Sequence, residues 1–113
     1  MDNLIIRKLE EKDLEELSLI YKQFWNEESS IEKMKKKYQE IKNNPNYIIL
    51  SAVIDEKIVG SIYGVICEEL YGLCRPYLVM EDLIVDKNLR RKGIGKALLK
   101  NLKKLVKRGN VAR

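Results

Sequence analysis

The sequence contains no histidine, and its 113 residues include only two cysteines, Cys67 and Cys74. Without histidine or a cluster of cysteines, a zinc site is not expected, and two cysteines do not form a disulfide framework. No apolar run approaches the roughly 20 residues that cross a bilayer, and residues 1–3 do not begin a signal peptide. These absences predict a metal-free protein of the reducing cytoplasm with no membrane partner.

Acidic residues are absent after Asp86. Residues 1–86 carry 11 basic and 17 acidic side chains, a net charge of −6, whereas residues 87–113 carry 11 basic side chains and a net charge of +11. The basic segment indicates either a polyanionic ligand near this end of the chain or a solvated helix face. It lacks the aromatic residues on which nucleic-acid bases stack, so nucleic-acid binding is a disfavoured alternative.

The stretch from Met80 to Leu99 combines a strand, a glycine loop and an amphipathic helix. The continuous apolar run 83–85 predicts a strand that is covered on both faces, and residues 86–88 supply turn chemistry. From Ile94 the apolar residues recur at helical spacing, which predicts one buried stripe. That stripe consists of Ile94, Leu98, Leu102 and Leu105, widened by Leu99 and Val106.

The loop between this strand and this helix has the chemistry of an anion site. Gly93 and Gly95 let a ligand approach the backbone closely, and the first N–H groups of a helix have no partner within it. The helix dipole and the cations at 90–92 add positive charge, so a diphosphate is the expected occupant. Two familiar phosphate motifs do not fit, because Ala97 replaces the Ser or Thr of a P-loop and Leu98 replaces the third glycine of a dinucleotide fingerprint.

The whole chain predicts the element order β-α-α-β-β-β-α in one domain, residues 1–113. Asp13 and Glu16 resemble a capping box that opens the first helix. The tripeptide 55–57, Asp-Glu-Lys, lies between two apolar runs and predicts a hairpin turn. We expect strands at 4–9, 47–54, 58–66 and 77–85, and helices at 14–25, at 31–41 and from 94 onward.

The pattern Arg-x-x-Gly-x-Gly after a strand that ends in Ile-Val resembles the acetyl-CoA-binding motif of the GNAT family of N-acetyltransferases. Here it consists of Arg90, Gly93 and Gly95 within a motif spanning 81–99. Glu81-Asp82 at its start resembles the polyamine (spermidine/spermine) N-acetyltransferase branch. The resemblance implies an α/β (α+β) fold of the GNAT type, with a mixed, mostly antiparallel sheet, helices on both faces, and acetyl-CoA as co-substrate.

The family's fold normally continues past this helix into further strands, and a tyrosine there often serves as general acid. Those parts have no counterpart in this sequence, so the resemblance implies a GNAT domain that is truncated after the motif helix. The strand at 77–85 would then be an edge of the sheet, which favours pairing with another chain. We expect either a fragment of a longer protein or a homodimer.

The resemblance implies that an acetyl group passes directly from acetyl-CoA to a primary amine of a small, polyamine-like acceptor or of a protein, in a ternary complex. It places the general base at Glu81, with Asp82 as the second candidate. Strand alternation predicts that Glu81 shares a face with Val79 and Leu83, and Asp82 with Met80 and Ile84. A carboxylate between apolar neighbours would suit a base that works near neutral pH.

The resemblance also assigns the two substrate sites. Aromatic faces beside carboxylates suit a cationic amine, so the expected acceptor residues are Trp25, Glu27 and Glu28. The expected acetyl-CoA contacts are Leu83, Ile84, Val85, Arg90, Arg91, Lys92, Gly93, Ile94, Gly95, Lys96 and Ala97. The alternative function is a non-catalytic acyl-CoA-binding fragment, or a domain that a partner completes.

Overall fold

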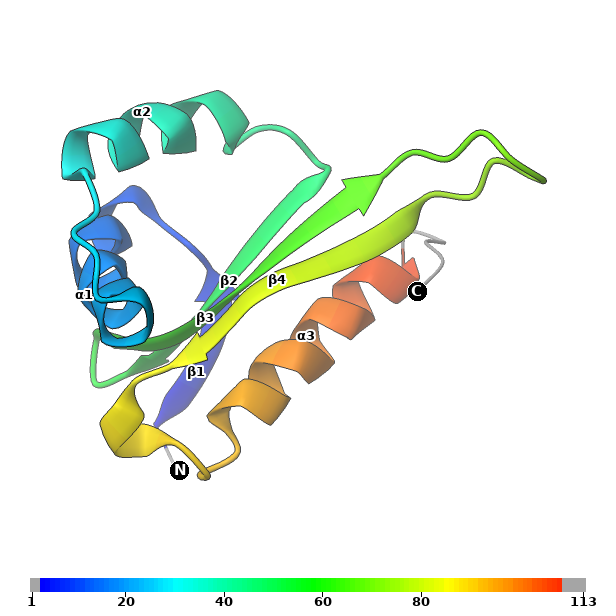
Figure 1. Ribbon diagram of the computed structural model, residues 1–113. Helices are drawn as coiled ribbons and strands as arrows, with labels where there is room; N and C mark the ends of the chain where they lie inside the picture. Colours follow the sequence, from blue (N-terminus) through cyan, green and yellow to red (C-terminus); the bar gives the residue numbers. More distant parts are fainter. Residues whose placement is uncertain (1–2, 109–113) are drawn as a thin grey trace.

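The computed structural model describes residues 3–108, with side chains described as far as Val106. Four strands and three helices follow the predicted order β-α-α-β-β-β-α, which confirms that prediction. They are β1 (Leu4–Lys8), α1 (Leu14–Trp25), α2 (Ile31–Ile41), β2 (Tyr47–Ile54), β3 (Lys57–Cys67), β4 (Tyr77–Val85) and α3 (Ile94–Arg108). The strands form one antiparallel sheet in the order β1-β2-β3-β4, with α1 and α2 over one face and α3 over the other (Figure 1).

Helix α3 packs its apolar stripe against one face of the sheet. Ile94, Leu98, Leu102 and Val106 are buried there, whereas Leu105 is 38% exposed, so Val106 takes the central place that the sequence predicted for Leu105. The reason is that the buried residues recur every four positions, and residues four apart lie on the same side of a helix. The residue four positions after Leu102 is Val106, not Leu105. Gly64 permits the close approach, because a Cβ atom there would lie 3.0 Å from a Leu102 methyl carbon.

A β-bulge interrupts β4 near its end. Tyr63 pairs with Glu81 and Ser61 pairs with Ile84, so Asp82 and Leu83 together oppose the single residue between those partners on β3. Asp82 adopts a left-handed conformation with φ of 51°. Bulges of this kind bend a strand and re-aim its side chains.

The bulge overturns two predictions about this strand. The sequence predicted that Glu81 and Leu83 share one face of the sheet. Because the bulge adds a residue, Ile84 rather than Leu83 lies on the same face as Glu81 and its partner Tyr63. Leu83 is 45% exposed, so the apolar run is not covered on both faces as predicted. In the described part of the chain β4 has only β3 as a neighbour, so its other edge stays open.

The connection from β1 to α1 is held by the Arg7–Asp13 ion pair and by a capping box that lies one turn earlier than predicted, formed by Glu10 and Asp13. Asp13 makes no capping hydrogen bond to α1; it accepts two hydrogen bonds from Arg7, at 2.7 and 2.9 Å, and one from the N–H of Glu10 at 2.8 Å. Glu16 accepts from the N–H of Ile58 at 3.0 Å and so ties α1 to β3. The predicted box of Asp13 and Glu16 therefore does not form, because Asp13 belongs to the box of the preceding turn and Glu16 bonds to β3.

The hairpin turn between β2 and β3 is one residue shorter than predicted. Asp55 and Glu56 both have positive φ, 50° and 66°, which is the signature of a two-residue type I′ turn, and Lys57 already belongs to β3. At the other end of β3, the β3–β4 hairpin extends well past α3 (Figure 1). Its connecting loop is exposed, with Leu70 at 92%.

Candidate acetyl-CoA and acceptor sites

The mouth of α3 presents backbone donors that have no acceptor. The first hydrogen bond of the helix runs from the N–H of Ala97 to the carbonyl oxygen of Gly93 at 3.0 Å. Within residues 3–108, no acceptor is found for the N–H groups of residues 91–96. Gly93 has φ of +84° and open space where a Cβ atom would be. These donors are therefore available to an anion that approaches the backbone.

Positive charge surrounds these donors. The first turn of α3 contains no acidic residue, although acidic side chains are favoured there by the helix dipole. It carries Lys96 instead, and Arg91 and Lys92 are exposed just before it. Cations at the N-terminus of a helix are repelled by the positive end of its dipole. An anionic ligand bound here would remove that repulsion.

Arg90 has a different environment from its neighbours. Its guanidinium carbon lies 4.5 Å from the centre of the Phe24 ring, and its Nε donates to the carbonyl oxygen of Val85 at 3.4 Å. Nearby, the N–H of Lys87 donates to Gln23 at 2.9 Å. Arg90, although exposed, thus ties the loop after β4 to the end of α1, whereas Arg91, Lys92 and Lys96 lie exposed beside the free N–H groups.

The end of β4 lies directly beside the mouth of α3. A Cβ atom at Gly95 would lie 3.7 Å from a methyl carbon of Val85. The predicted acetyl-CoA residues of the strand, 83–85, and those of the helix mouth, 93–97, are therefore brought together. The free edge of β4 can accept an extended ligand as an added strand would be accepted, and the helix mouth can accept its anionic end.

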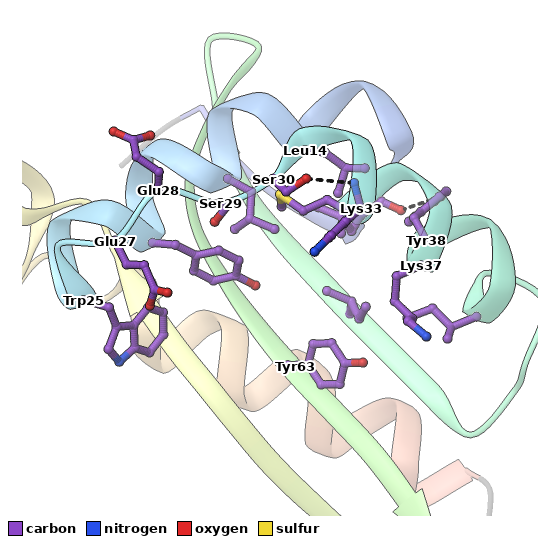
Figure 2. Close-up of a pocket in the computed structure, with 16 residues that line it drawn as sticks. Leu14, Trp25, Glu27, Glu28, Ser29, Ser30, Lys33, Lys37, Tyr38 and Tyr63 are labelled. Carbon is purple, nitrogen blue, oxygen red and sulfur yellow. Dashed lines mark hydrogen bonds between the residues drawn. The ribbon is translucent and has the colours of Figure 1, made fainter.

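A cavity of about 560 Å³ opens between α1, α2 and the sheet (Figure 2). All three predicted acceptor residues line it: Trp25, Glu27 and Glu28. Glu27 lies beside Trp25, whereas Glu28 points away from the cavity and forms an ion pair with Lys22 (Figure 2). The remaining lining residues are Leu9, Leu14, Leu17, Tyr21, Ser29, Ser30, Lys33, Met34, Lys37, Tyr38, Ile41, Ile49 and Tyr63.

Three tyrosines line this cavity, Tyr21, Tyr38 and Tyr63, and none was predicted as a site residue. Burial, then the negative charge of Asp82 and the neighbouring Tyr63, raise the pKa of Tyr21 to about 12. Burial, then Tyr47 and Asp82, also raise the pKa of Tyr63. In the sequence, Tyr21 continued the apolar stripe of its helix and Tyr63 lay within a strand, so no local signal distinguished either from a core residue.

The two predicted catalytic carboxylates lie at the bulge of β4, on the side of this cavity. Glu81 is exposed and shares the sheet face of its partner Tyr63, so it is not enclosed by apolar neighbours as predicted. Asp82 lies near enough to Tyr21 to act on its pKa. Neither carboxylate is in an ion pair with another described side chain, so both are available for proton transfer.

Two further findings bear on the expected absences. Within residues 3–108 no group of His, Cys, Asp or Glu side chains is arranged to hold a metal ion. None of the helices in the described part of the chain is both long and apolar enough to cross a membrane.

Residues 13–113 match the Acetyltransferase (GNAT) family, so the chain belongs to that family, whose co-substrate is acetyl-CoA. It is similar to an acetyltransferase from Trypanosoma brucei (22% identity, 96% of this chain, 78% of that one, TM-score 0.84). It is similar to the aminoglycoside acetyltransferase meta-AAC0020 from an uncultured soil sample (26%, 97% and 74%, TM-score 0.78). It is also similar to glucosamine-6-phosphate N-acetyltransferase from Arabidopsis thaliana (22%, 96% and 77%, TM-score 0.83).

Proposed function

We propose that this chain transfers an acetyl group from acetyl-CoA directly to a primary amine of a small molecule or a protein. The observation that carries the proposal is the row of free N–H groups at residues 91–96, flanked by cations and adjoining the open edge of β4. Membership of the GNAT family supports it. Two similar structures are named as acetyltransferases of an aminoglycoside and of glucosamine-6-phosphate, which favours a small acceptor.

The chain fits the two ends of acetyl-CoA at two adjoining places. The diphosphate would be held by the N–H groups of the α3 mouth, with Arg91, Lys92 and Lys96 as nearby cations. The backbone of 83–85 would bind the extended pantetheine arm along the free edge of β4. Acetyl-CoA, once bound, supplies a thioester whose acyl carbon accepts the amine nitrogen and whose leaving group is the thiol of coenzyme A.

The amine has to lose a proton as it attacks, and Glu81 is proposed as the base that accepts it. Asp82 is the second candidate, because it lies close enough to Tyr21 and Tyr63, which line the cavity, to raise their pKa values. An N–H group of Ile84 or Val85 would stabilise the negative charge that develops on the acyl oxygen. Neither cysteine is required, since no acyl-enzyme forms.

Replacing Lys96 with Glu tests the proposed diphosphate site, because we expect it to weaken acetyl-CoA binding without lowering the stability of the fold. A glutamate in the first turn of α3 complements the helix dipole, so the free energy of unfolding should stay equal or rise by about 0.3–1 kcal/mol. The same charge repels a diphosphate, so acetyl-CoA should bind about 10- to 100-fold more weakly by calorimetric titration.

Lys100→Glu is the matched control, because Lys100 is exposed one turn further along α3. It should change acetyl-CoA affinity far less than Lys96→Glu does. Equal affinities of the wild type and of Lys96→Glu would contradict the proposed diphosphate site. Release of coenzyme A thiol in the presence of an amine panel separates an enzyme from the alternative, a protein that only binds acyl-CoA.

A further inference from the structure

The charged residues that line the acceptor cavity divide into paired and unpaired groups. Glu28 is in an ion pair with Lys22, and Lys37 is in an ion pair with Glu40 at 2.7 Å. Glu27 and Lys33 also line the cavity, and neither has an ion-pair partner among the side chains described through Val106. One anion and one cation therefore remain for a ligand.

These two charges come from different elements of the cavity wall. Glu27 follows α1 and lies beside Trp25, whereas Lys33 extends from α2 toward the cavity (Figure 2). The ring centres of Tyr21 and Trp25 are 5.5 Å apart, so two aromatic rings lie close together on the side of Glu27. Asp82 adds negative charge on the same side, close to Tyr21. Aromatic faces with unpaired carboxylates suit an ammonium group.

Much of the remaining lining of the cavity is apolar. Leu14, Leu17 and Ile49 are among the residues that line it, and their side chains offer no hydrogen-bonding groups. A ligand that spans the cavity would therefore need a hydrocarbon or ring body between its two polar ends. The volume of about 560 Å³ is in the range that holds a small organic molecule.

Lys33 also occupies a position where helix stability favours an acid. Ser30 caps α2, and its hydroxyl accepts from the N–H of Lys33 at 3.2 Å. A glutamate at this third helical position would complete a capping box and complement the dipole, which a lysine cannot do. A cation at this position, directed toward the cavity, is thus not explained by the stability of the helix.

We propose that the acceptor is a bipolar amine, which carries an anionic group, a carboxylate or a phosphate, at the end away from the amine that is acetylated. The proposal rests on the proposed function and specifies its substrate class. The amine end would lie against Trp25 and Glu27, and the anionic end against Lys33. A polyamine would instead bring a second cation against Lys33, so this proposal disfavours the polyamine acceptors that the Glu81-Asp82 resemblance suggested.

The test compares acceptors that differ only at the far end. Coenzyme A release would be measured with 6-aminohexanoate, hexylamine and 1,6-diaminohexane, and with their shorter and longer homologues. The same assay with aminoalkyl phosphates of matching chain length shows whether the anionic group is preferred as a carboxylate or as a phosphate. We expect kcat/KM to be about three- to tenfold higher for the anionic acceptor than for the neutral one, and lower again for the diamine, as one partly exposed ion pair predicts.

Lys33→Glu should reverse this order and favour the diamine, and it should fold at least as well as the wild type because it completes the capping box. Lys35→Glu makes the same charge change on the same helix at an exposed residue that does not line the cavity, and it should leave the order unchanged. Equal rates for the three acceptors, or a preference of the wild type for diamines, would overturn the bipolar acceptor while the acetyl transfer itself stands. Absence of coenzyme A release with every amine would instead overturn the proposed function, and this inference with it.

Discussion

Asp13 is the buried carboxylate on which the connection from β1 to α1 depends. It is 3% exposed, and it is held by two hydrogen bonds from Arg7 and one from the N–H of Glu10. Burial by itself raises the pKa of Asp13, but the hydrogen bonds from Arg7 and from the Glu10 backbone outweigh it and lower the pKa below its ordinary value. The ionised form is therefore the one that stabilises the fold.

Asp13→Asn should lower the free energy of unfolding by about 1–3 kcal/mol near pH 7, because Arg7 loses the more buried of its two charged partners and keeps only Glu10. Since the folded pKa lies below the unfolded value, the contribution of Asp13 is full above about pH 4 and is lost as pH falls through the folded pKa. Urea unfolding curves of wild type and variant should thus converge toward about pH 2. Glu15→Gln, at an exposed position of α1, is the control; a pH-independent difference would refute this account.

Glu81 is the residue at which the proposed chemistry is most directly tested. Glu81→Gln keeps the size of the side chain and removes its capacity to accept a proton. We expect kcat to fall about 10²- to 10⁴-fold while the affinity for acetyl-CoA is unchanged, because the proposed cofactor contacts do not include the side chain of Glu81. Asp82→Asn, assayed in parallel, shows which carboxylate is the base, and Glu56→Gln in the β2–β3 turn controls for charge. Unchanged turnover in Glu81→Gln would exclude Glu81 as the base.

At the scale of elements, β4 and α3 together form the proposed cofactor site. The bulge at Asp82 and Leu83 bends β4 where it meets the helix, and the left-handed conformation of Gly93 turns the chain into α3. Helix α3 is then anchored by its buried stripe, from Ile94 to Val106. Because that anchoring fixes the mouth of the helix, its free N–H groups are held in place before any ligand binds.

The buried stripe of α3 can be tested with two leucines on the same helix. Leu102 is 0% exposed and packs against Gly64, so Leu102→Ala should lower the free energy of unfolding by about 2–5 kcal/mol. Leu105 is 38% exposed, and Leu105→Ala should cost less than about 1 kcal/mol. Denaturant titrations of the two variants measure the difference. Equal losses would mean that Leu105 lies in the core, as the sequence pattern alone suggested.

At the scale of the whole molecule, the sheet separates the two proposed substrates. Helix α3, with the proposed anion site, lies over one face, and the cavity proposed for the acceptor lies over the other, between the sheet and the helices α1 and α2 (Figure 1). Strand β4 contacts helices on both sides, α3 and α1. Its bulge is therefore the part of the chain where a thioester along the strand edge and an amine in the cavity can meet.

The open edge of β4 leads to a prediction about assembly. Leu83 is 45% exposed and Met80 is 44% exposed, beside backbone groups that have no neighbouring strand within residues 3–108. We propose that the 113-residue chain forms a homodimer that covers this edge. Size-exclusion chromatography with light scattering should give the mass of a dimer, and Leu83→Lys should shift it toward the monomer. A wild-type monomer that stays soluble at high concentration would count against this assembly.

The sequence by itself determined the order of the elements, the helices 14–25 and 31–41, and the glycine loop at 90–95 that precedes α3, because these follow from periodicity and glycine placement over a few residues. The tertiary structure decided what depends on partners distant in the sequence. It placed the bulge at Asp82, directed Arg90 to Phe24, and brought Tyr21 and Tyr63 to one cavity. Strand register and the packing of α1 on the sheet fix these contacts, and no local pattern in the sequence records them.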